Sequence, residues 1–321
     1  MDDLGLIGKS EYIQNIRRDI LRLASGIFPI IIEGPSGTGK EIIAKAVHNN
    51  STRASNTMVT INCAAIPKDL EESEFFGHAK GSYTGATSDK EGLVAQANNS
   101  TLFLDEIGEI SLSMQAKLLR VLDTGEYLPI GKIKTEKCDL RIISATNKSL
   151  YDMVQINTFR TDLYYRLKGA SIKTLPITQH KEDIQYLVRY FLALQDNTVP
   201  KDIDPDALGM LMSCQWTGNV RELRYTMEVI GHAAIGLPIV NAAIVGSVLD
   251  IDRHVSVCSE DVSYSQEKDR ILKDFEMRYF SGLLLRFKGN VSKAAEIAGM
   301  YRPNFSKKLK NLGINPNSFR K

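Results

Sequence analysis

The sequence has no apolar run near the length of about 20 residues that a membrane-spanning helix needs. Its first residues, Met1 to Leu4, carry neither the basic nor the apolar stretch of a secretory signal. Paired cysteines are also missing, because no Cys-x-x-Cys pair occurs among Cys63, Cys138, Cys214 and Cys258. That spacing disfavours a zinc site and disulfides. These absences predict a cytoplasmic protein with free thiols and no membrane contact.

The chain as a whole lacks a strong net charge, since it carries only +2 over 321 residues. The charge is uneven, however: from residue 286 to the end, nine basic residues face the single acid Glu296, a net +8. The rest of the chain therefore carries −6. A basic end on an acidic body indicates a polyanion as partner for that end. A merely solvated charged surface is an equally good explanation of the charge alone.

The length is enough for two or three compact units. In the first half, apolar strand-like runs alternate with helical patterns, and the strand candidates cover residues 28–33, 58–62, 101–104 and 140–145. Such alternation predicts a mostly parallel sheet that helices cover on both faces. After about Lys173 the strand signals stop, and helical patterns cover residues 183–195, 206–214, 220–231 and 240–249.

This pattern predicts an α/β nucleotide-binding unit over residues 1–172 and a helical lid over residues 173–249. Residues 250–266 are polar and are expected to form a linker. A last helical unit is expected over residues 267–321.

Residues 34–40, Gly-Pro-Ser-Gly-Thr-Gly-Lys, fit the P-loop pattern and lie between a strand candidate and a helix candidate over residues 41–48. Glycines let consecutive backbone N–H groups turn toward phosphates, and the following helix N-terminus adds its dipole. Lys40 would reach the outer phosphates as a point charge. A chance glycine loop would lack this strand–loop–helix context. The predicted ATP-binding residues here are Gly34, Pro35, Ser36, Gly37, Thr38, Gly39, Lys40 and Glu41.

An apolar strand candidate, residues 102–104, ends in the two acids Asp105 and Glu106. Asp105 suits a Mg²⁺ ligand, and Glu106 suits the residue that polarises an attacking water. Alone, this pattern usually marks only the end of a strand; together with the P-loop it predicts ATP hydrolysis. Glu41 departs from the general P-loop motif, which has Ser or Thr for magnesium after the lysine.

With residues 76–86 (Phe-Gly-His-Ala-Lys-Gly-Ser-Tyr-Thr-Gly-Ala), these segments closely resemble the AAA+ activators of the sigma-54 form of bacterial RNA polymerase. The resemblance runs from about Leu6 to the C-terminus, and glutamate after the P-loop lysine is usual in that family. It implies ATP and Mg²⁺ as cofactors and hydrolysis at the interfaces of a hexameric ring. Ile7 and Gly8 resemble the adenine-side start of the family.

Within that stretch, residues 81–86 resemble the family's GAFTGA loop, which contacts the sigma factor at the pore of the ring. Ser82 and Tyr83 replace its usual alanine and phenylalanine. Residues 125–135 correspond to a second pore loop that supports the first. The resemblance thus implies a sigma-factor contact through Gly81, Ser82, Tyr83, Thr84, Gly85 and Ala86.

Further roles follow from the resemblance one residue at a time. Asn147 matches the sensor of the γ-phosphate, Arg221 matches the second sensor in the lid, and Asn62 matches the residue that restrains Glu106. Arg160 and Arg166 match paired arginines that a neighbouring subunit inserts. From the residues alone, two such arginines on a helix are more simply surface salt-bridge formers.

Residues 290–305 are typical of a helix, a glycine turn and a second helix, and they resemble the Fis-type helix-turn-helix. The small apolar face is expected from Ala294, Ala295, Ile297 and Ala298. Pro303 suits the first turn of the second helix, whereas Tyr301 stands where Ser or Thr normally caps it. A helix over residues 272–287 is expected to pair two subunits on two-fold symmetric, double-stranded DNA.

The charge of +8 disfavours a small protein-interaction module in place of this DNA-binding unit. Arg302 and Asn304 lie at the N-terminal end of the second helix, where base edges are read. The remaining candidates for DNA binding would neutralise phosphates: Lys293, Lys307, Lys308 and Lys310.

We expect an ATP-hydrolysing transcriptional activator that binds upstream DNA and remodels the closed complex of sigma-54 RNA polymerase. No receiver domain precedes the motor, so we expect a short member controlled by another protein in trans, or a fragment. Two alternatives remain: a different AAA+ remodeller, which the Gly81–Ala86 motif disfavours, and a non-catalytic DNA-binding regulator that keeps the AAA+ fold. The intact Lys40, Asp105 and Glu106 disfavour the second.

Overall fold

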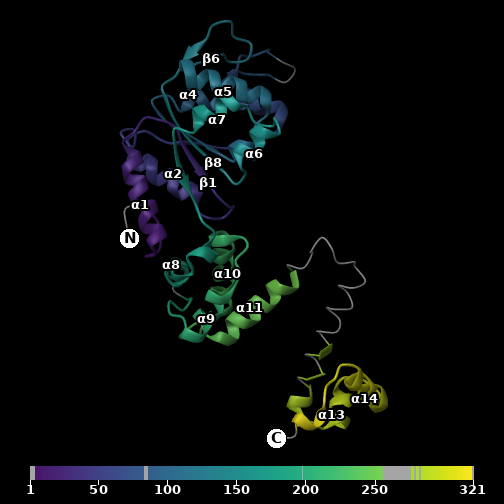
Figure 1. The fold of residues 1–321 in the computed structure, drawn as a ribbon. Helices are drawn as coiled ribbons and strands as arrows, with labels where there is room; N and C mark the ends of the chain where they lie inside the picture. Colours follow the sequence, from purple (N-terminus) through teal and green to yellow (C-terminus); the bar gives the residue numbers. More distant parts are fainter. Residues whose placement is uncertain are drawn as a thin grey trace. The chain divides into compact units, whose positions relative to one another are not determined.

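The computed structural model describes residues 4–82, 86–196, 198–255, 276–277, 280–281 and 283–319 (Figure 1). The chain divides into two compact units, Met1–Val248 and Leu249–Lys321. Within the described residues, no helix has both the length and the apolar character needed to cross a bilayer.

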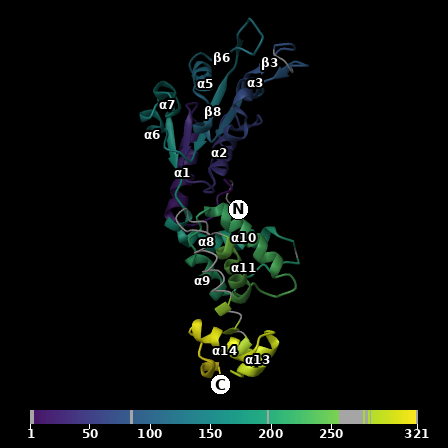
Figure 2. The ribbon, with the colours of Figure 1, turned by 90° about the vertical axis from the view of Figure 1, so that its right-hand side faces the viewer.

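The first unit is built on a sheet whose described strands are all parallel, in the order β2-β5-β8-β1-β9. Strands β1 and β8 of this sheet are labelled in Figure 1, and β8 is labelled again in the turned view of Figure 2. The predicted parallel sheet is therefore confirmed. The chain passes from β1 to the far strand β2 and later crosses β1 to reach β9. Ligands of open α/β sheets bind beside such a switch in strand order, at the carboxyl ends of the strands. The strands are β1 (Ile30–Glu33), β2 (Val59–Asn62), β5 (Ser100–Asp105), β8 (Leu140–Thr146) and β9 (Ala170–Lys173).

Strand β9 was absent from the sequence prediction. Its residues Ala-Ser-Ile-Lys bury only Ile172, so neither an apolar run nor a clear alternation marks it. It forms because its backbone pairs with β1 in parallel register from Ile30↔Ala170 to Glu33↔Lys173. This is tertiary pairing that overrides a weak local preference.

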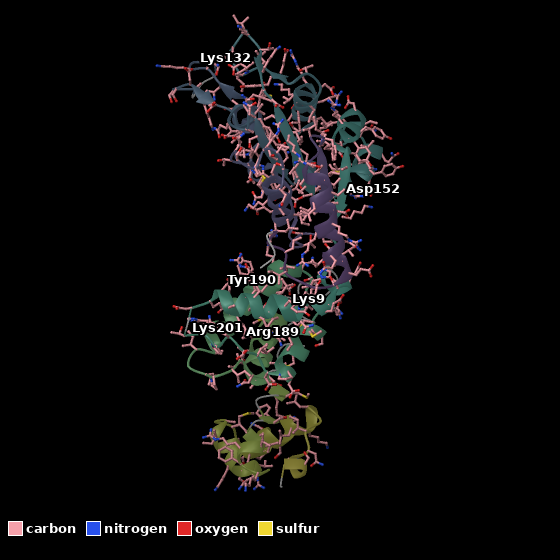
Figure 3. The ribbon with its side chains drawn as sticks, turned by 90° about the vertical axis from the view of Figure 1, so that its left-hand side faces the viewer. Lys9, Lys132, Asp152, Arg189, Tyr190 and Lys201 are labelled. Carbon is pink, nitrogen blue, oxygen red and sulfur yellow. The ribbon has the colours of Figure 1, made fainter. Side chains whose placement is uncertain are left out.

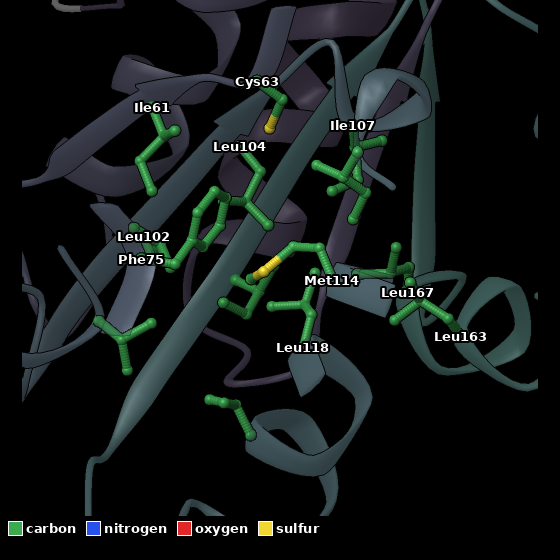
Figure 4. Close-up of a cluster of buried hydrophobic side chains, with 14 of the residues drawn as sticks. Ile61, Cys63, Phe75, Leu102, Leu104, Ile107, Met114, Leu118, Leu163 and Leu167 are labelled. Carbon is green, nitrogen blue, oxygen red and sulfur yellow. The ribbon is translucent and has the colours of Figure 1, made fainter. Parts of the chain in front are cut away.

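Alternate side chains of the strands enter two separate cores, as the two-residue period of a strand requires. On one face, Ile31, Leu102 and Leu104 pack in a cluster with Phe75, Met114 and Leu118 (Figure 4). On the other face, Ile30, Ile32 and Phe103 pack against the helices α1 (Glu11–Ala24) and α2 (Lys40–Asn49). A one-residue shift of a strand would exchange the side chains of the two cores. Such a shift is unfavourable because each fully buried leucine or isoleucine contributes about 1.5–3 kcal/mol to stability.

The helices of the first face are α3 (Glu71–Phe76), α4 (Leu93–Gln96), α5 (Leu112–Thr124), α6 (Leu150–Gln155) and α7 (Thr161–Leu167). The other face carries α1 (Glu11–Ala24) and α2 (Lys40–Asn49). Short 3-10 turns η1 (Cys63–Ala65), η2 (Lys68–Leu70) and η3 (Ile107–Glu109) connect the elements. Two antiparallel pairs project from this frame: β3 (Gly77–His78) with β4 (Lys90–Glu91), and β6 (Glu126–Tyr127) with β7 (Glu136–Lys137).

The cysteines that the structure describes, Cys63, Cys138 and Cys214, are free thiols, as expected. Burial raises the pKa of Cys63 to about 12 and that of Cys138 to about 11. These two thiols therefore stay protonated and unreactive at neutral pH. Cys258 lies outside the described residues.

A helical region follows β9 after the 3-10 turns η4 (Ile177–Gln179) and η5 (Lys181–Asp183). Each of its helices overlaps a predicted helical range. Lys201, labelled in Figure 3, closes the end of α8 because its Nζ donates to the carbonyl oxygens of Leu192, Gln195 and Asp196 at 2.6–3.1 Å. The helices are α8 (Ile184–Leu194), α9 (Pro205–Ser213), α10 (Asn219–Ala233) and α11 (Ala242–Val255).

The last helix of this region is longer than expected. Helix α11 continues to Val255, six residues into the range 250–266 that was expected to be linker. Residues 250–255 are polar in part but contain neither proline nor glycine, and polarity alone does not end a helix. The rest of the expected linker lies outside the described residues.

The second unit contains α13 (Val291–Ile297), α14 (Arg302–Asn311) and the 3-10 turn η6 (Pro316–Phe319). Gly299, with φ of 64°, makes the turn between the two helices. Phe305 of α14 is buried, with its ring edge-on to Phe280 at a centroid distance of 5.0 Å. Most of the helix expected over residues 272–287 lies outside the described residues, and so does the pairing of subunits assigned to it.

One prediction about the packed face of α13 was wrong. Ala294 and Ala295 are buried and Ala298 packs against them, but Ile297 is 58% exposed. The helical period explains the difference, because at 3.6 residues per turn Ile297 points about 110° away from the centre of the alanine stripe.

Candidate functional site

The P-loop sequence leaves β1 at its carboxyl end and enters α2 at Lys40. Gly37 and Gly39 take left-handed backbone angles, with φ of 75° and 90°. Apart from Gly39 itself and its chain neighbours, none of the described residues has a heavy atom within 4 Å of the position that a Cβ would occupy at Gly39, so a phosphate can approach the backbone there. The N–H groups of the first turn of α2 have no partners within the helix, and such a helix start binds phosphate.

The side chain of Lys40 is held inside this loop. It is only 7% exposed, and its Nζ donates to the carbonyl oxygens of Gly34 at 2.9 Å and Pro35 at 3.2 Å. Burial lowers the pKa of Lys40, and the nearby charges of Glu106 and Asp105 oppose that shift. Lys40 is thus near enough to both predicted acids for their charges to act on it.

Asp105 is the last residue of β5 and is paired in register with Asn62 of β2. Burial and the charge of Glu106 raise the pKa of Asp105, whereas Lys40 lowers it. A partly buried carboxylate near the lysine of a P-loop fits Mg²⁺, which proteins usually hold through one or two carboxylates, phosphate oxygens and water. These residues therefore fit the predicted cofactor.

Glu106 has a left-handed backbone, with φ of 53° and ψ of 51°. A non-glycine residue in that region costs about 1–2 kcal/mol, and such strain is concentrated at functional sites. The strained turn directs its carboxylate to the end of β8, where Oε2 accepts a hydrogen bond of 3.1 Å from the backbone N–H of Asn147. The catalytic candidate and the sensor candidate are thus in contact.

Asn62 is the last residue of β2 and lies beside Asp105 in the sheet register. Its side-chain oxygen accepts a 3.0 Å hydrogen bond from the backbone N–H of Ala64 and so caps η1. In the part of the chain that the structure describes, no hydrogen bond joins Asn62 to Glu106. The restraint of Glu106 by Asn62 stays a prediction.

The lid contacts the P-loop through the start of α10. Arg221 donates from Nη1 to the hydroxyl of Ser36 at 2.9 Å. The backbone N–H of Val220 donates to the carbonyl of Gly37 at 3.0 Å. The side-chain amide of Asn219 donates to the carbonyl of Ser36 at 2.9 Å.

The prediction from sequence overlooked Asn219 and also Thr174, whose hydroxyl lies 2.7 Å from that of Thr38. A signal for Asn219 was present, because Gly218-Asn219 is a turn dipeptide at a helix start and asparagine tolerates the left-handed region. Asn219 has a φ of 56°. Nothing in the sequence around Thr174 marks its contact.

Ile7 and Gly8, the adenine-side candidates, lie in the segment before α1. The buried carboxylate of Asp183 accepts hydrogen bonds from the backbone N–H groups of Lys9 at 2.7 Å and Ser10 at 2.9 Å. A Cβ at Gly8 would lie 2.6 Å from the same carboxylate. Burial raises the pKa of Asp183, but the hydrogen bonds from His180, Ser10 and Lys9 outweigh burial and hold it below its usual value. The lid is therefore tied to the Gly8 segment as well as to the P-loop.

This segment and helix α8 border one groove. Lys9 and Tyr190, both labelled in Figure 3, line it together with Ile7, Gly8 and Tyr186. The Nζ of Lys9 lies 5.2 Å from the centre of the Tyr186 ring. Ile7 and Gly8 are thus placed beside aromatic side chains of the lid.

Arg160 and Arg166 lie away from the P-loop contacts, next to α5. Arg160 precedes α7 in an extended conformation and pairs with both carboxylate oxygens of Asp162 at 2.7 and 3.0 Å. Only Arg166 lies in the helix, where its guanidinium contacts Asp123 at 3.1 Å. Both side chains are partly exposed. Each arginine does form a surface ion pair, and each is accessible from outside the chain.

The stem of the expected sigma-contact loop is closed. The backbone N–H of Gly81 donates to the carbonyl of Ala86 at 2.9 Å, and Ala86 is buried. Tyr83, Thr84 and Gly85 lie outside the described residues. The predicted second loop lies against this stem, because Ala79 N donates to the carbonyl of Ile130 at 2.9 Å.

In the second unit, most of the DNA-binding candidates are exposed: Lys293, Arg302, Asn304, Lys307 and Lys310. Lys308 differs, because its Nζ forms a 2.6 Å ion pair with Glu276 and it is only partly exposed. Tyr301 is the N-cap of α14 and makes no side-chain cap hydrogen bond. The exposed set leaves basic side chains on α13 and along α14 available to a polyanion.

A P-loop at the carboxyl edge of a parallel sheet, contacted by an arginine from a helical lid, defines an AAA+ nucleotide-binding protein. Residues 6–173 match the Sigma-54 interaction domain, and residues 178–239 match the AAA+ ATPase lid domain. The chain belongs to the sigma-54-dependent transcriptional regulators, which confirms the predicted family.

Relatives resemble nearly the whole chain. The DNA-binding transcriptional regulator NtrC of Bradyrhizobium sp. (strain RP501 Parasponia) is 36% identical over 98% of this chain and 70% of its own. The regulatory protein AtoC of Escherichia coli (strain K12) is 38% identical over 97% and 68%. The structure of NtrX from Brucella abortus in complex with ADP is similar with a TM-score of 0.71 and 34% identity, over 98% of this chain and 70% of that one.

Proposed function

We propose that this protein hydrolyses ATP with Mg²⁺ and uses the energy to activate transcription by sigma-54 RNA polymerase. The observation that carries the proposal is the convergence of Lys40, Asp105, Glu106 and the lid residue Arg221 on one P-loop. Backbone strain such as that of Glu106 is concentrated at functional sites. A strained glutamate near the P-loop lysine therefore favours an active ATPase over a non-catalytic protein with the same fold. The proposed location is the cytoplasm.

Each residue has a role that its position allows. Lys40 binds the outer phosphates, and Asp105 holds Mg²⁺, which supplies charge neutralisation at the phosphate oxygens. Glu106 orients and polarises the attacking water, and Asn147 holds the Glu106 carboxylate through its backbone. Asn62 is proposed to restrain Glu106, and Ile7 and Gly8 to border the adenine.

Hydrolysis is proposed at the interfaces of a hexameric ring. Arg160 and Arg166 are exposed ion-pair formers in one protomer, and a neighbour's phosphates would compete with Asp162 and Asp123 for them. An arginine supplied in trans raises the hydrolysis rate by about 10³–10⁵-fold. A ring would therefore hydrolyse ATP much faster than a separate protomer.

The loop of residues 81–86 is proposed to deliver the work to the sigma factor. Its stem is closed by the hydrogen bond from Gly81 to Ala86, and Ala79, just before the stem, is held by a hydrogen bond to the carbonyl of Ile130. The C-terminal unit is proposed to bind upstream double-stranded DNA as a dimer, through Arg302 and Asn304 at bases and lysines at phosphates.

The test compares Tyr83→Ala with Glu106→Gln in two assays, ATP turnover and opening of a sigma-54 promoter. Glu106→Gln should abolish both activities, because the water is no longer polarised. Tyr83→Ala should keep ATP turnover and lose promoter opening. Promoter opening by Tyr83→Ala would refute the role of the loop. Absence of turnover in the unsubstituted protein would favour the alternative, a non-catalytic DNA-binding regulator.

A further inference from the structure

The side chain of Asn219 joins three segments that are distant in the sequence. Its amide nitrogen donates to the carbonyl of Ser36 in the P-loop at 2.9 Å, across 183 residues. Its amide oxygen accepts from the backbone N–H of Ile177 at 3.0 Å. Ile177 begins η4, in the connection between the sheet and the lid. One side chain therefore binds the P-loop and the hinge and belongs itself to the lid helix α10.

This amide is buried, with Asn219 only 3% exposed. A buried amide that loses its partner costs about 1–3 kcal/mol. The carbonyl of Ser36 therefore cannot shift unless Asn219 follows it or this cost is met. Such a cost corresponds to a coupling of about 5- to 150-fold between the two positions.

Arg221 contacts the same P-loop residue in a different way. Its long side chain reaches the Ser36 hydroxyl at an exposed site, so it can follow a moving loop by changing rotamer. Asn219 is short and contacts the backbone. The lid backbone is thus tied to the P-loop backbone by the Asn219 side chain and by the adjacent Val220–Gly37 backbone hydrogen bond rather than by Arg221.

Few residues satisfy what this position requires. The backbone at residue 219 is left-handed, with φ of 56°, which glycine, asparagine and aspartate tolerate best. Of these, only asparagine has both a donor for the Ser36 carbonyl and an acceptor for the Ile177 N–H. The backbone and the hydrogen bonds can therefore be tested separately.

We propose that Asn219 is the positioning residue that couples the P-loop to the lid hinge, so that a nucleotide on the P-loop holds the lid in place. The inference rests on the proposed nucleotide binding and names the residue that transmits it. Loss of the amide should weaken nucleotide binding and also free the hinge from nucleotide control. A residue that only stabilised the fold would change neither nucleotide affinity nor the control of the hinge by the nucleotide.

The experiment uses the full chain and ADP, so it needs no turnover. ADP affinity is measured by calorimetry, and the hinge over residues 174–183 is probed by limited proteolysis with and without saturating ADP. The variants are Asn219→Asp, which keeps the acceptor and loses the donor, and Asn219→Gly, which keeps the left-handed backbone and loses both. Asn99→Asp and Asn99→Gly are the matched controls, since Asn99 is exposed, has a φ of 60° and precedes β5 at its amino end.

In the unsubstituted protein and in both controls, ADP should protect the hinge from proteolysis. Both Asn219 variants should bind ADP about 10-fold more weakly or worse and should lose the protection even at saturating ADP. Thermal unfolding of each variant shows whether it is folded, and Asn219→Gly remains informative if Asn219→Asp unfolds. Wild-type behaviour of Asn219→Gly would overturn the proposal, because the backbone alone would then explain the residue.

Failure of the proposed function gives a different result. If the unsubstituted protein binds no ADP, nucleotide binding itself is refuted and the coupling falls with it. If the unsubstituted protein binds ADP and its hinge is protected equally in both Asn219 variants, only the role of Asn219 is refuted.

Discussion

Gly37 and Gly39 have similar backbone angles but very different surroundings, and we expect alanine to act differently at each. A Cβ at Gly37 would lie 2.2 Å from the carbonyl oxygen of Gly218 in the lid. A Cβ at Gly39 would meet no atom of the described residues within 4 Å beyond its chain neighbours. Gly37→Ala should therefore separate the lid from the P-loop, whereas Gly39→Ala should leave the lid attached.

The magnitude follows from the contacts that Gly37→Ala would break. Retreat of the lid by about 1 Å, the distance needed to restore normal packing, would stretch the hydrogen bonds that Val220, Asn219 and Arg221 make to the P-loop. Three bonds at about 0.5–1.5 kcal/mol each amount to about 1.5–4.5 kcal/mol. Left-handed alanine adds about 1–2 kcal/mol at either position, so the excess cost of Gly37→Ala should be about 1.5–4.5 kcal/mol.

Hydrogen exchange of the α10 amides in the nucleotide-free protein measures this difference locally. Exchange in α10 should be faster in Gly37→Ala by a factor of about 10 or more, and near that of the unsubstituted protein in Gly39→Ala. Gly39→Ala should instead weaken ADP binding, because its methyl group occupies the open approach to the loop. Equal exchange of α10 in the two variants would refute the assignment of Gly37 to lid contact.

Two further predictions concern single side chains. Asp105→Asn should lower ATP turnover by about 100-fold or more, because the proposed magnesium ligand is lost. The same variant should make the nucleotide-free protein more stable at neutral pH, because burial raises the pKa of Asp105 and disfavours its charged form. The gain in stability should be complete above the raised pKa of Asp105 and should fade as the pH falls through that pKa. Urea titrations at several pH values measure it, and a stability gain that grows as the pH falls would contradict this sign. Tyr301→Ser should stabilise α14 by about 1 kcal/mol, because Tyr301 is an N-cap without a cap hydrogen bond. Thermal unfolding of the full chain measures this, and an unchanged or lower transition of the C-terminal unit would count against it.

Local patterns were enough to predict the strands β1, β2, β5 and β8 and the acids at the end of β5. The apolar runs of β1, β5 and β8 are buried, whereas β2 fully buries only Ile61. A P-loop needs its glycines, its lysine and its helix in consecutive positions. Asp105 and Glu106 were also predictable from local sequence, because they lie at the end of the apolar run that forms β5. The family resemblance, in turn, depended on contiguous motifs.

Contacts between distant residues were decided only by the tertiary structure. The bonds of Asn219 to Ser36 and of Asp183 to Ser10 join residues 183 and 173 positions apart, and no local pattern encodes such a distance. Pairing with β1 made a strand of residues 170–173, and packing in the second unit exposed Ile297 and paired Lys308 with Glu276. Residue types and their spacing determined which candidate catalytic groups are present. The packing of the lid on the sheet determined which side chains position those groups, because burial creates partners that the order of the chain does not specify.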